Sequence, residues 1–169
     1  SMNIEKLDLL KPAIDFLLSE GFSKLYPPQA DCVDAGLLGG KSILVSAPTA
    51  SGKTLTAILA TISYLSKNNG KVIYLSPLRA LAAEKFTEFK KLEKVELGKK
   101  IKVGISTGDF ENIEKNLEKN DVIILTNEKM DSIIRHGAEW IDEIGLIIAD
   151  EIHLIGDETR GPTLEMILT

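Results

Sequence analysis

Residues 47–54 have the composition of a phosphate-binding loop. They follow an apolar run at positions 43–45 and read Ala47, Pro48, Thr49, Ala50, Ser51, Gly52, Lys53 and Thr54. Small residues let backbone N–H groups turn toward a triphosphate, and a helix that starts there adds the positive end of its dipole. We expect Lys53 to reach the β- and γ-phosphates and the Thr54 hydroxyl to ligate Mg²⁺. Ala47 replaces the first glycine of the general pattern, which a negative φ would tolerate.

Two carboxylates follow a second apolar run at positions 146–149. A run that is apolar on both faces is typical of a central parallel strand, and such strands carry functional groups at their carboxyl ends. There Asp150 can hold Mg²⁺, and Glu151 can orient or deprotonate an attacking water. The alternatives are a surface turn with an ordinary lysine and a solvated acidic turn. Together, the two segments predict a site in which Lys53, Thr54, Asp150 and Glu151 surround one magnesium-bound triphosphate.

The ordered motifs resemble those of the superfamily 2 helicases of the DExH kind. Positions 47–54 look like motif I, and Asp150-Glu151-Ile152-His153 looks like motif II. Residues 25–29 look like the adenine-reading Q motif, 76–81 like motif Ia, and 106–109 and 126–129 like later strand-binding motifs. Residues 160–165 are similar to the superkiller-like branch, which includes archaeal DNA repair helicases and eukaryotic RNA helicases. Asn127 departs from the pattern, because relatives usually have proline there.

The resemblance implies further roles. Gln29 is expected to read adenine, since an amide can donate and accept at the same time; Phe22 or Tyr26 could stack on the base or fill the core. His153 is expected to couple the nucleotide state to the rest of the motor. The implied nucleic-acid contacts are Arg79, Thr107, Gly108, Thr126 and Asn127. As isolated residues, these five would be turn, capping or salt-bridge residues.

The composition limits the class of protein. The chain has 169 residues, 44% of them hydrophobic and 27% charged, which suits one domain with a full core. Its net charge of −5 argues against binding nucleic acid by bulk charge. No apolar run is long enough to span a membrane. The single Cys32 excludes an internal disulfide, there is no zinc-spaced Cys/His cluster, and nothing implies an oligomer. An intracellular protein is expected, cytoplasmic or, in a eukaryote, nuclear.

Short β-branched runs alternate with helical segments along the chain. Strands are expected at 42–46, 72–76, 102–106, 122–126 and 146–150. Helices are expected at 4–19, 27–38, 54–67, 79–95, 110–119, 128–136 and 139–143. This order predicts an α/β fold with a mainly parallel sheet covered on both faces. The resemblance narrows it to one RecA-like P-loop NTPase domain over residues 2–169, in which 2–40 form a helical lead-in.

The expected function is that of the ATP-binding domain of an ATP-dependent helicase with ATP and Mg²⁺ as cofactors. Single-stranded nucleic acid is the expected partner, and the context at 160–165 favours DNA over RNA. An RNA helicase, a P-loop enzyme such as a small-molecule kinase, and a non-catalytic scaffold remain alternatives. The second RecA-like domain, with its arginine fingers, is expected elsewhere in the same protein. The isolated chain is therefore expected to bind ATP but to hydrolyse it very slowly, since such fingers contribute about 10³–10⁵ in rate.

Overall fold

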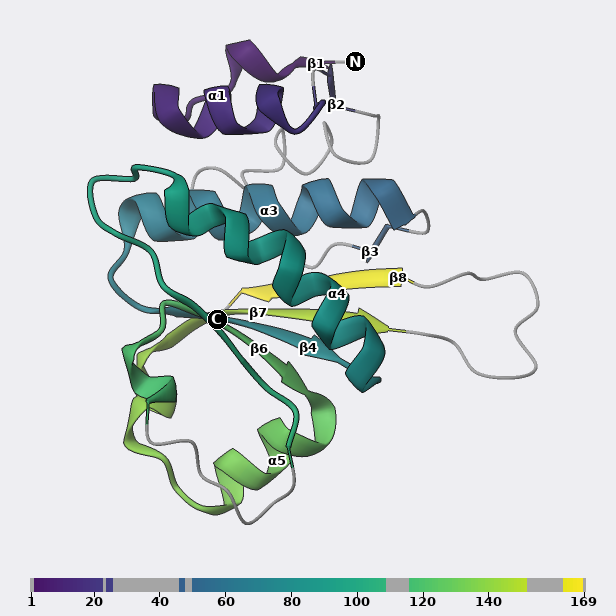
Figure 1. The fold of residues 1–169 in the computed structure, drawn as a ribbon, viewed down its shortest axis with the longest axis vertical. Helices are drawn as coiled ribbons and strands as arrows, with labels where there is room; N and C mark the ends of the chain where they lie inside the picture. The colour runs from purple at the N-terminus through teal and green to yellow at the C-terminus, as the bar shows by residue number, and fades with distance from the viewer. Residues whose placement is uncertain are drawn as a thin grey trace, which may run out of the picture.

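The computed structural model describes residues 2–22, 24–25, 46–47, 50–108, 116–151 and 163–168. Its main feature is a six-stranded sheet with the strand order β3-β8-β7-β4-β6-β5 (Figure 1). The strands are β3 (Ser46–Ala47), β4 (Lys71–Ser76), β5 (Val103–Ser106), β6 (Val122–Thr126), β7 (Ile144–Glu151) and β8 (Thr163–Leu168). Strands β7, β4, β6 and β5 run parallel, and β8 pairs antiparallel with both β7 and β3. The mainly parallel α/β sheet expected from the sequence is therefore confirmed.

Helices cover both faces of the sheet. Helices α3 (Ala50–Lys67) and α4 (Arg79–Lys90) lie on one face, and α5 (Asn127–Arg135) with the 3₁₀ turn η5 (Glu139–Glu143) lies on the other (Figure 1). The N-terminal end of α3 points to the same side of the molecule as the carboxyl ends of β4 and β7. In a parallel α/β sheet, this is the side on which ligands bind.

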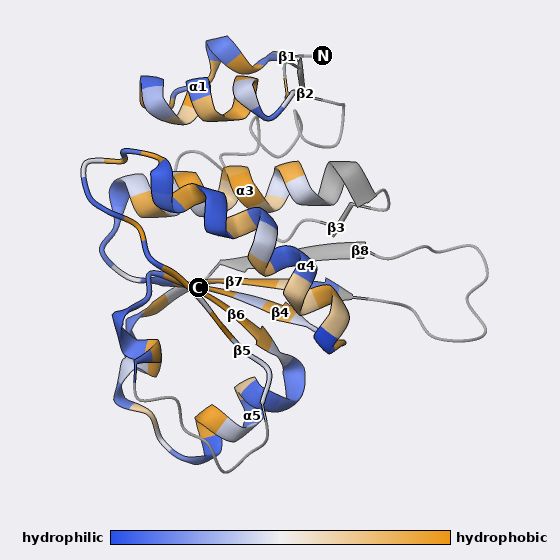
Figure 2. Cartoon of the chain, in the orientation of Figure 1, coloured by the Kyte–Doolittle hydropathy of each residue, from blue (hydrophilic) through white to orange (hydrophobic). Residues whose placement is uncertain are grey.

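The core follows from the two-residue repeat of the strands. On β4, β6 and β7, alternate side chains enter two separate apolar clusters, one under α3 and α4 and one under α5. The first contains Val72, Tyr74, Val122, Ile124, Leu146 and Ile148; the second contains Ile73, Leu75, Ile123, Leu125 and Ile147. Figure 2 shows these strands as the most hydrophobic part of the molecule. Burial on both faces explains why the sequence there is continuously apolar.

The N-terminal segment differs from the single helix expected at 4–19. It forms the short strand β1 (Met2–Asn3), which pairs with β2 (Lys24–Leu25), then the 3₁₀ turn η1 (Ile4–Lys6) and the helix α1 (Lys11–Ser19). The helix begins late because Pro12 occupies its first turn, where proline lacks an N–H and fixes φ. Gly21, with a φ of 88°, ends the helix as expected.

Other helices also differ from the bounds or the helix type expected from the sequence. The helix expected at 79–95 ends at Lys90 and continues as the 3₁₀ turn η3 (Lys91–Lys94), and the segment 139–143 is 3₁₀ rather than α. Of the helix expected at 110–119, the described part contains only the 3₁₀ turn η4 (Leu117–Lys119). The helix expected at 27–38 lies outside the described residues, as does all of the strand expected at 42–46 except Ser46. Strand β8 was not expected.

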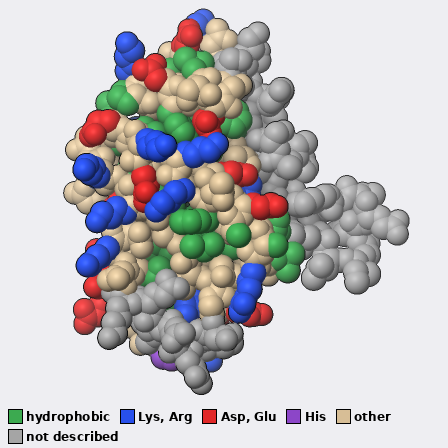
Figure 3. Space-filling view, viewed as in Figure 1, with side chains coloured by type: hydrophobic (Ala, Val, Ile, Leu, Met, Phe, Trp, Pro, Cys, Tyr) green, Lys and Arg blue, Asp and Glu red, His purple; other side chains and the backbone are tan. Residues whose placement is uncertain are grey.

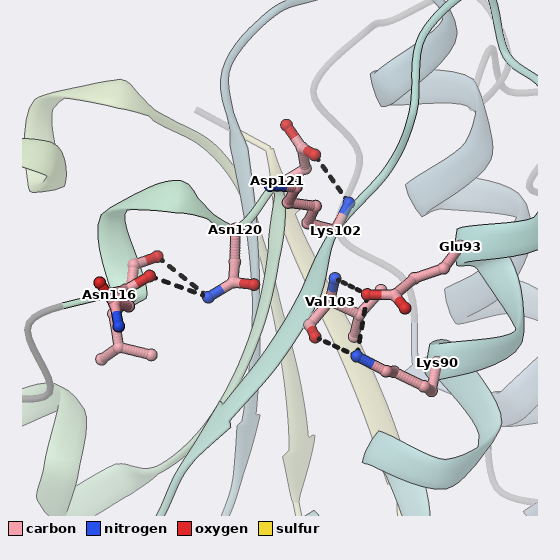
Figure 4. A network of polar contacts seen from close by, with 8 residues as sticks. Lys90, Glu93, Lys102, Val103, Asn116, Asn120 and Asp121 are labelled. Atoms are coloured by element: carbon pink, nitrogen blue, oxygen red, sulfur yellow. Dashed lines mark hydrogen bonds and ion pairs between the residues drawn. The ribbon is translucent and has the colours of Figure 1, made fainter.

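The edge strand β5 is held at its start by charged side chains (Figure 4). The Val103 N–H donates to Oε2 of Glu93 at 2.9 Å, and Lys90 Nζ donates to the same oxygen at 2.9 Å and to the Val103 carbonyl at 3.3 Å. On the neighbouring side, the Lys102 N–H donates to Oδ2 of Asp121 at 2.9 Å. These side chains satisfy backbone groups that an edge strand would otherwise leave unpaired.

The ionisation of Glu93 reflects these contacts. Burial works against the charged form, but the Val103 hydrogen bond and the nearby Lys90 outweigh it and lower the pKa of Glu93 below its ordinary value. The many charged residues around position 93 would, from the sequence alone, predict a solvent-exposed helix end. The structure shows instead that part of it fastens β5 to the end of α4.

Candidate nucleotide-binding site

The start of α3 provides the backbone of the predicted phosphate site. The helix begins at Ala50, so Ala50, Ser51, Gly52 and Lys53 already form its first turn, four residues earlier than the start expected from the sequence. The first four N–H groups of an α-helix have no partner within the helix and carry the positive end of its dipole. An anion at this end would therefore meet donors from the residues that the sequence assigned to the loop. Ala47 lies just before, in β3.

Thr54 contacts a residue that the sequence did not single out. Nζ of Lys85, on α4, donates to Oγ1 of Thr54 at 2.9 Å and to Oε2 of Glu88 at 3.1 Å. The Lys85 side chain is mostly covered, with 12% of its area exposed, whereas Glu88 is 38% exposed. The hydroxyl predicted to ligate Mg²⁺ is thus tied to α4 in this structure.

Asp150 lies near the carboxyl end of β7 with only 5% of its surface exposed. The Tyr74 hydroxyl, on β4, donates to its Oδ2 atom at 3.0 Å. A buried carboxylate is costly without such a donor. Burial, followed by the charge and hydrogen bond of Asp150, strongly raises the pKa of Tyr74, so the phenol keeps its proton and acts as the donor.

Helix α4 lies against both halves of the site. Lys85 reaches Thr54, the Glu88 charge contributes to raising the Tyr74 pKa, and the Phe89 ring packs against the Tyr74 ring with centroids 5.5 Å apart. Positions 85, 88 and 89 share one face of a helix. One face of α4 therefore connects Thr54, in the second turn of α3, with Tyr74, the hydrogen-bond partner of Asp150.

The predicted nucleic-acid contacts follow the ends of neighbouring strands. Arg79 is exposed and begins α4 after β4, Thr126 ends β6 and Asn127 follows it, and Thr107 and Gly108 follow β5. Because β4, β6 and β5 are adjacent and parallel, these residues share the sheet edge at which β7 delivers Asp150. The structure thus places the five predicted contacts in a row beside the predicted nucleotide site.

Thr126 has a structural task in addition to its predicted one. It is buried, and its hydroxyl accepts the Lys129 N–H at 3.2 Å, so that it caps α5. Asn127 is exposed as the first residue of that helix. Thr126 therefore is a helix-capping residue, which was one of the alternatives drawn from the sequence. Its contact with nucleic acid stays a prediction.

Several predicted site residues cannot be placed. Gln29, Tyr26, Thr49 and His153 lie outside the described residues. For Lys53 and Glu151 the structure describes only the backbone, in the first turn of α3 and at the last position of β7. Their predicted roles in phosphate binding and water activation stay predictions.

Comparison with known proteins defines the class to which this fold and site belong. The DEAD/DEAH box helicase profile matches residues 26–169. The chain therefore belongs to the DEAD/DEAH box helicase family, and the resemblance drawn from the motifs is confirmed.

Individual relatives make the comparison within this family more specific. The chain is 48% identical over 168 residues to the ATP-dependent DNA helicase Hel308 of Pyrococcus horikoshii and 45% identical to that of Methanocella arvoryzae. Both alignments cover 99% of the chain but only 23% of the relative. The chain thus corresponds to less than a quarter of either relative, the part expected to be the first RecA-like domain.

Solved structures support the fold. The DUF1998 helicase MrfA matches with a TM-score of 0.68 over 85% of the chain and 24% of MrfA, at 24% identity. MrfA bound to DNA and AMPPNP matches with a TM-score of 0.69 at 29% identity, over 85% of the chain and 21% of MrfA. The RecA-like fold expected from the sequence is confirmed by these neighbours.

The sequence interpretation missed Tyr74 and Lys85. A signal existed for Tyr74, because a tyrosine inside a strand buried on both faces needs a partner for its hydroxyl. No comparable signal existed for Lys85, since its i,i+3 spacing to Glu88 predicts only an ordinary ion pair on a helix. Its contact with Thr54 depends on how α3 and α4 pack.

Proposed function

We propose that this chain is the ATP-binding domain of an ATP-dependent DNA helicase. The observation that carries the proposal is the shared edge at which the first turn of α3 and the end of β7 lie (Figure 1). There Thr54 contacts Lys85 of α4, and Asp150 contacts Tyr74 of β4, whose ring packs against Phe89 of α4. Membership of the DEAD/DEAH box helicase family supports the same function and argues against a small-molecule kinase. The relatives named ATP-dependent DNA helicases favour DNA over RNA.

In this proposal each residue of the site has a separate task. The N–H groups at the start of α3 and the Lys53 ammonium bind the phosphates. Glu151 orients the attacking water and accepts its proton. Gln29 reads the adenine, and His153 passes the nucleotide state to the rest of the motor. Together these residues would bind ATP, position its terminal phosphate and activate water.

Thr54 and Asp150 fit the hard oxygen donors that Mg²⁺ prefers. Mg²⁺ is commonly bound by one or two protein oxygens together with the phosphates of the substrate. The Asp150 carboxylate accepts a hydrogen bond from Tyr74 on one oxygen, and Thr54 supplies a hydroxyl in the second turn of α3. When bound, the ion would offset the negative charge of the phosphates. We therefore assign Thr54 and Asp150 as the residues that hold it.

The strand ends beside this site would bind single-stranded DNA without reading its sequence. Hydroxyls, backbone N–H groups and one arginine suit phosphate contacts. In Figure 3, basic and acidic side chains are interspersed over the visible face, and the chain as a whole is acidic. Binding would therefore rely on local contacts from Arg79, Thr107, Gly108, Thr126 and Asn127.

Among the helices that the structure describes, none combines the length and the apolar character needed to cross a bilayer.

The test is ATP turnover by the longer protein with and without single-stranded DNA. The proposal expects DNA to stimulate turnover, single-stranded RNA of the same sequence to stimulate it less, and Glu151→Gln to keep ATP bound while nearly stopping turnover. The chain alone should bind ATP and turn it over very slowly, because it is proposed to need the second RecA-like domain of the same protein. Turnover indifferent to nucleic acid would contradict the helicase assignment, and equal stimulation by RNA would contradict the preference for DNA.

A further inference from the structure

Tyr74 occupies an unusual place for a tyrosine. It lies in the middle of β4, is 1% exposed and packs its ring against Phe89 of α4. In the parallel register Tyr74 is opposite Ile148, so Asp150 lies two residues further along β7, on the same face of the sheet. The tyrosine side chain therefore extends along the sheet toward its carboxyl edge and meets Oδ2 of Asp150 at 3.0 Å.

This contact restricts how the Asp150 carboxylate can turn. A carboxylate at a strand end can rotate about χ1 and χ2, and a metal ligand that rotates freely must lose that freedom on binding. The donor that holds Oδ2 is itself rigid, because the Tyr74 ring is enclosed by the core and by Phe89. Tyr74, which lies deeper in the protein than the site, thus restricts the orientation of Asp150.

We propose that Tyr74 is a positioning residue for Asp150, holding its carboxylate in the orientation in which it binds the magnesium ion of the nucleotide complex. The inference rests on the proposed function, since it requires Asp150 to be a metal ligand. Hydrogen-bond partners of metal ligands typically contribute 10- to 100-fold to metal affinity. Tyr74 would contribute in this way without touching nucleotide or metal.

A tyrosine that only fills the core would behave differently. Removing its hydroxyl would lower stability through the lost hydrogen bond but would leave the metal dependence of nucleotide binding unchanged. The distinguishing quantity is therefore the metal gain, defined as the ratio of the ATP dissociation constant in EDTA to that in excess Mg²⁺. A purely structural role does not move this ratio.

The experiment measures the metal gain of this chain by calorimetric titration with ATP. Tyr74→Phe keeps the ring and removes only the hydroxyl; it should lower the metal gain about 10- to 100-fold and leave the affinity in EDTA unchanged. The matched control is Tyr64→Phe, which removes a hydroxyl that lies against Gly70 and Gly145, away from Asp150. The control should keep the full metal gain.

The outcomes separate this inference from the function on which it rests. An undiminished metal gain in Tyr74→Phe would overturn the positioning role while leaving the proposed function intact. No ATP binding by the unmodified chain would overturn both. If Tyr74→Phe is less stable, all variants are measured at a temperature where circular dichroism shows each to be folded. In the Asp150→Asn background, Tyr74→Phe should have no further effect on the metal gain; an additional loss there would show that Tyr74 acts through another group.

Discussion

Both side chains proposed to hold the metal, Thr54 and Asp150, are engaged by other protein groups in this structure. Lys85 donates to Thr54, and Tyr74 donates to Asp150. The two contacts differ in kind. Tyr74 is a fixed neutral donor in the core, whereas Lys85 carries a positive charge on a flexible stem and can move when another cation arrives. Asp150 is thus held by a rigid partner and Thr54 by an adaptable one.

Lys53→Ala tests the phosphate-binding role of the first turn of α3. The lysine is proposed to supply the positive charge nearest to the β- and γ-phosphates, so its loss should reduce ATP binding by this chain below detection in a calorimetric titration. Lys67→Ala, at the opposite end of the same helix, is the control and should bind ATP normally. An unchanged ATP affinity in Lys53→Ala would exclude the phosphate-binding role.

Gly108→Ala separates a structural glycine from one that a ligand approaches. A Cβ at this position would meet no described atom within 4 Å, so the free energy of unfolding should change by less than about 0.5 kcal/mol. If a DNA phosphate approaches the backbone closely there, the added methyl group should obstruct that approach, and affinity for single-stranded DNA should fall by roughly 2- to 10-fold, comparable to the loss of one hydrogen bond. Fluorescence anisotropy with labelled DNA, together with urea unfolding, measures both; unaltered DNA affinity would remove Gly108 from the interface.

Among the secondary-structure elements, the parallel strands were the most predictable. Strand β6 has the expected bounds, and β4, β5 and β7 differ from their expected bounds by at most two residues at either end, because burial on both faces leaves a continuous apolar run in the sequence. A short-range signal, Gly21, also located the end of α1, which stops at Ser19. The start of α1 was wrong because Pro12 outweighed the helical periodicity before it.

Contacts between elements were less predictable. Nothing near Glu93 indicates that its carboxylate accepts the N–H of Val103, ten residues later, across a chain reversal. The same holds for Tyr74 and Asp150, which become neighbours only through the β4–β7 pairing. The sequence therefore predicted which residues lie at the sheet edge, but not which buried groups orient them.

Glu93→Gln tests how the end of α4 fastens β5. The folded-state pKa of Glu93 lies below the unfolded value of about 4.3, so its contribution is complete above that value and is lost as the pH falls through the lower folded value. At pH 7 the variant should lose about 1 kcal/mol of unfolding free energy, and the difference should vanish under strongly acidic conditions. Urea unfolding at pH 7 and under strongly acidic conditions measures the free energy of unfolding of the variant and of the parent. Glu96→Gln, an exposed neighbour, should match the parent at each pH, and an equal loss in Glu93→Gln at both would contradict the ionic contribution.

Across the chain, the topology explains how separated segments come together. Parallel strands end at one edge, so residues at or just after the carboxyl ends of β4, β5, β6 and β7 share that edge although they span positions 79 to 151. One face of helix α4 contacts Thr54 through Lys85 and packs Phe89 against Tyr74, the hydrogen-bond partner of Asp150. The proposed nucleotide site and the proposed DNA track are thus neighbours within a single sheet, and α4, which begins with Arg79, contacts both.

The most direct test is whether Thr54 and Asp150, far apart in the sequence, act on the same metal ion. The metal gain in ATP affinity is measured for the unmodified chain, for Thr54→Ala, for Asp150→Asn and for the double variant. With one shared magnesium ion, each single variant loses most of the gain, and the double variant loses little more than either single one. A full gain in either single variant, or losses that simply add, would show that the two residues do not bind a common ion.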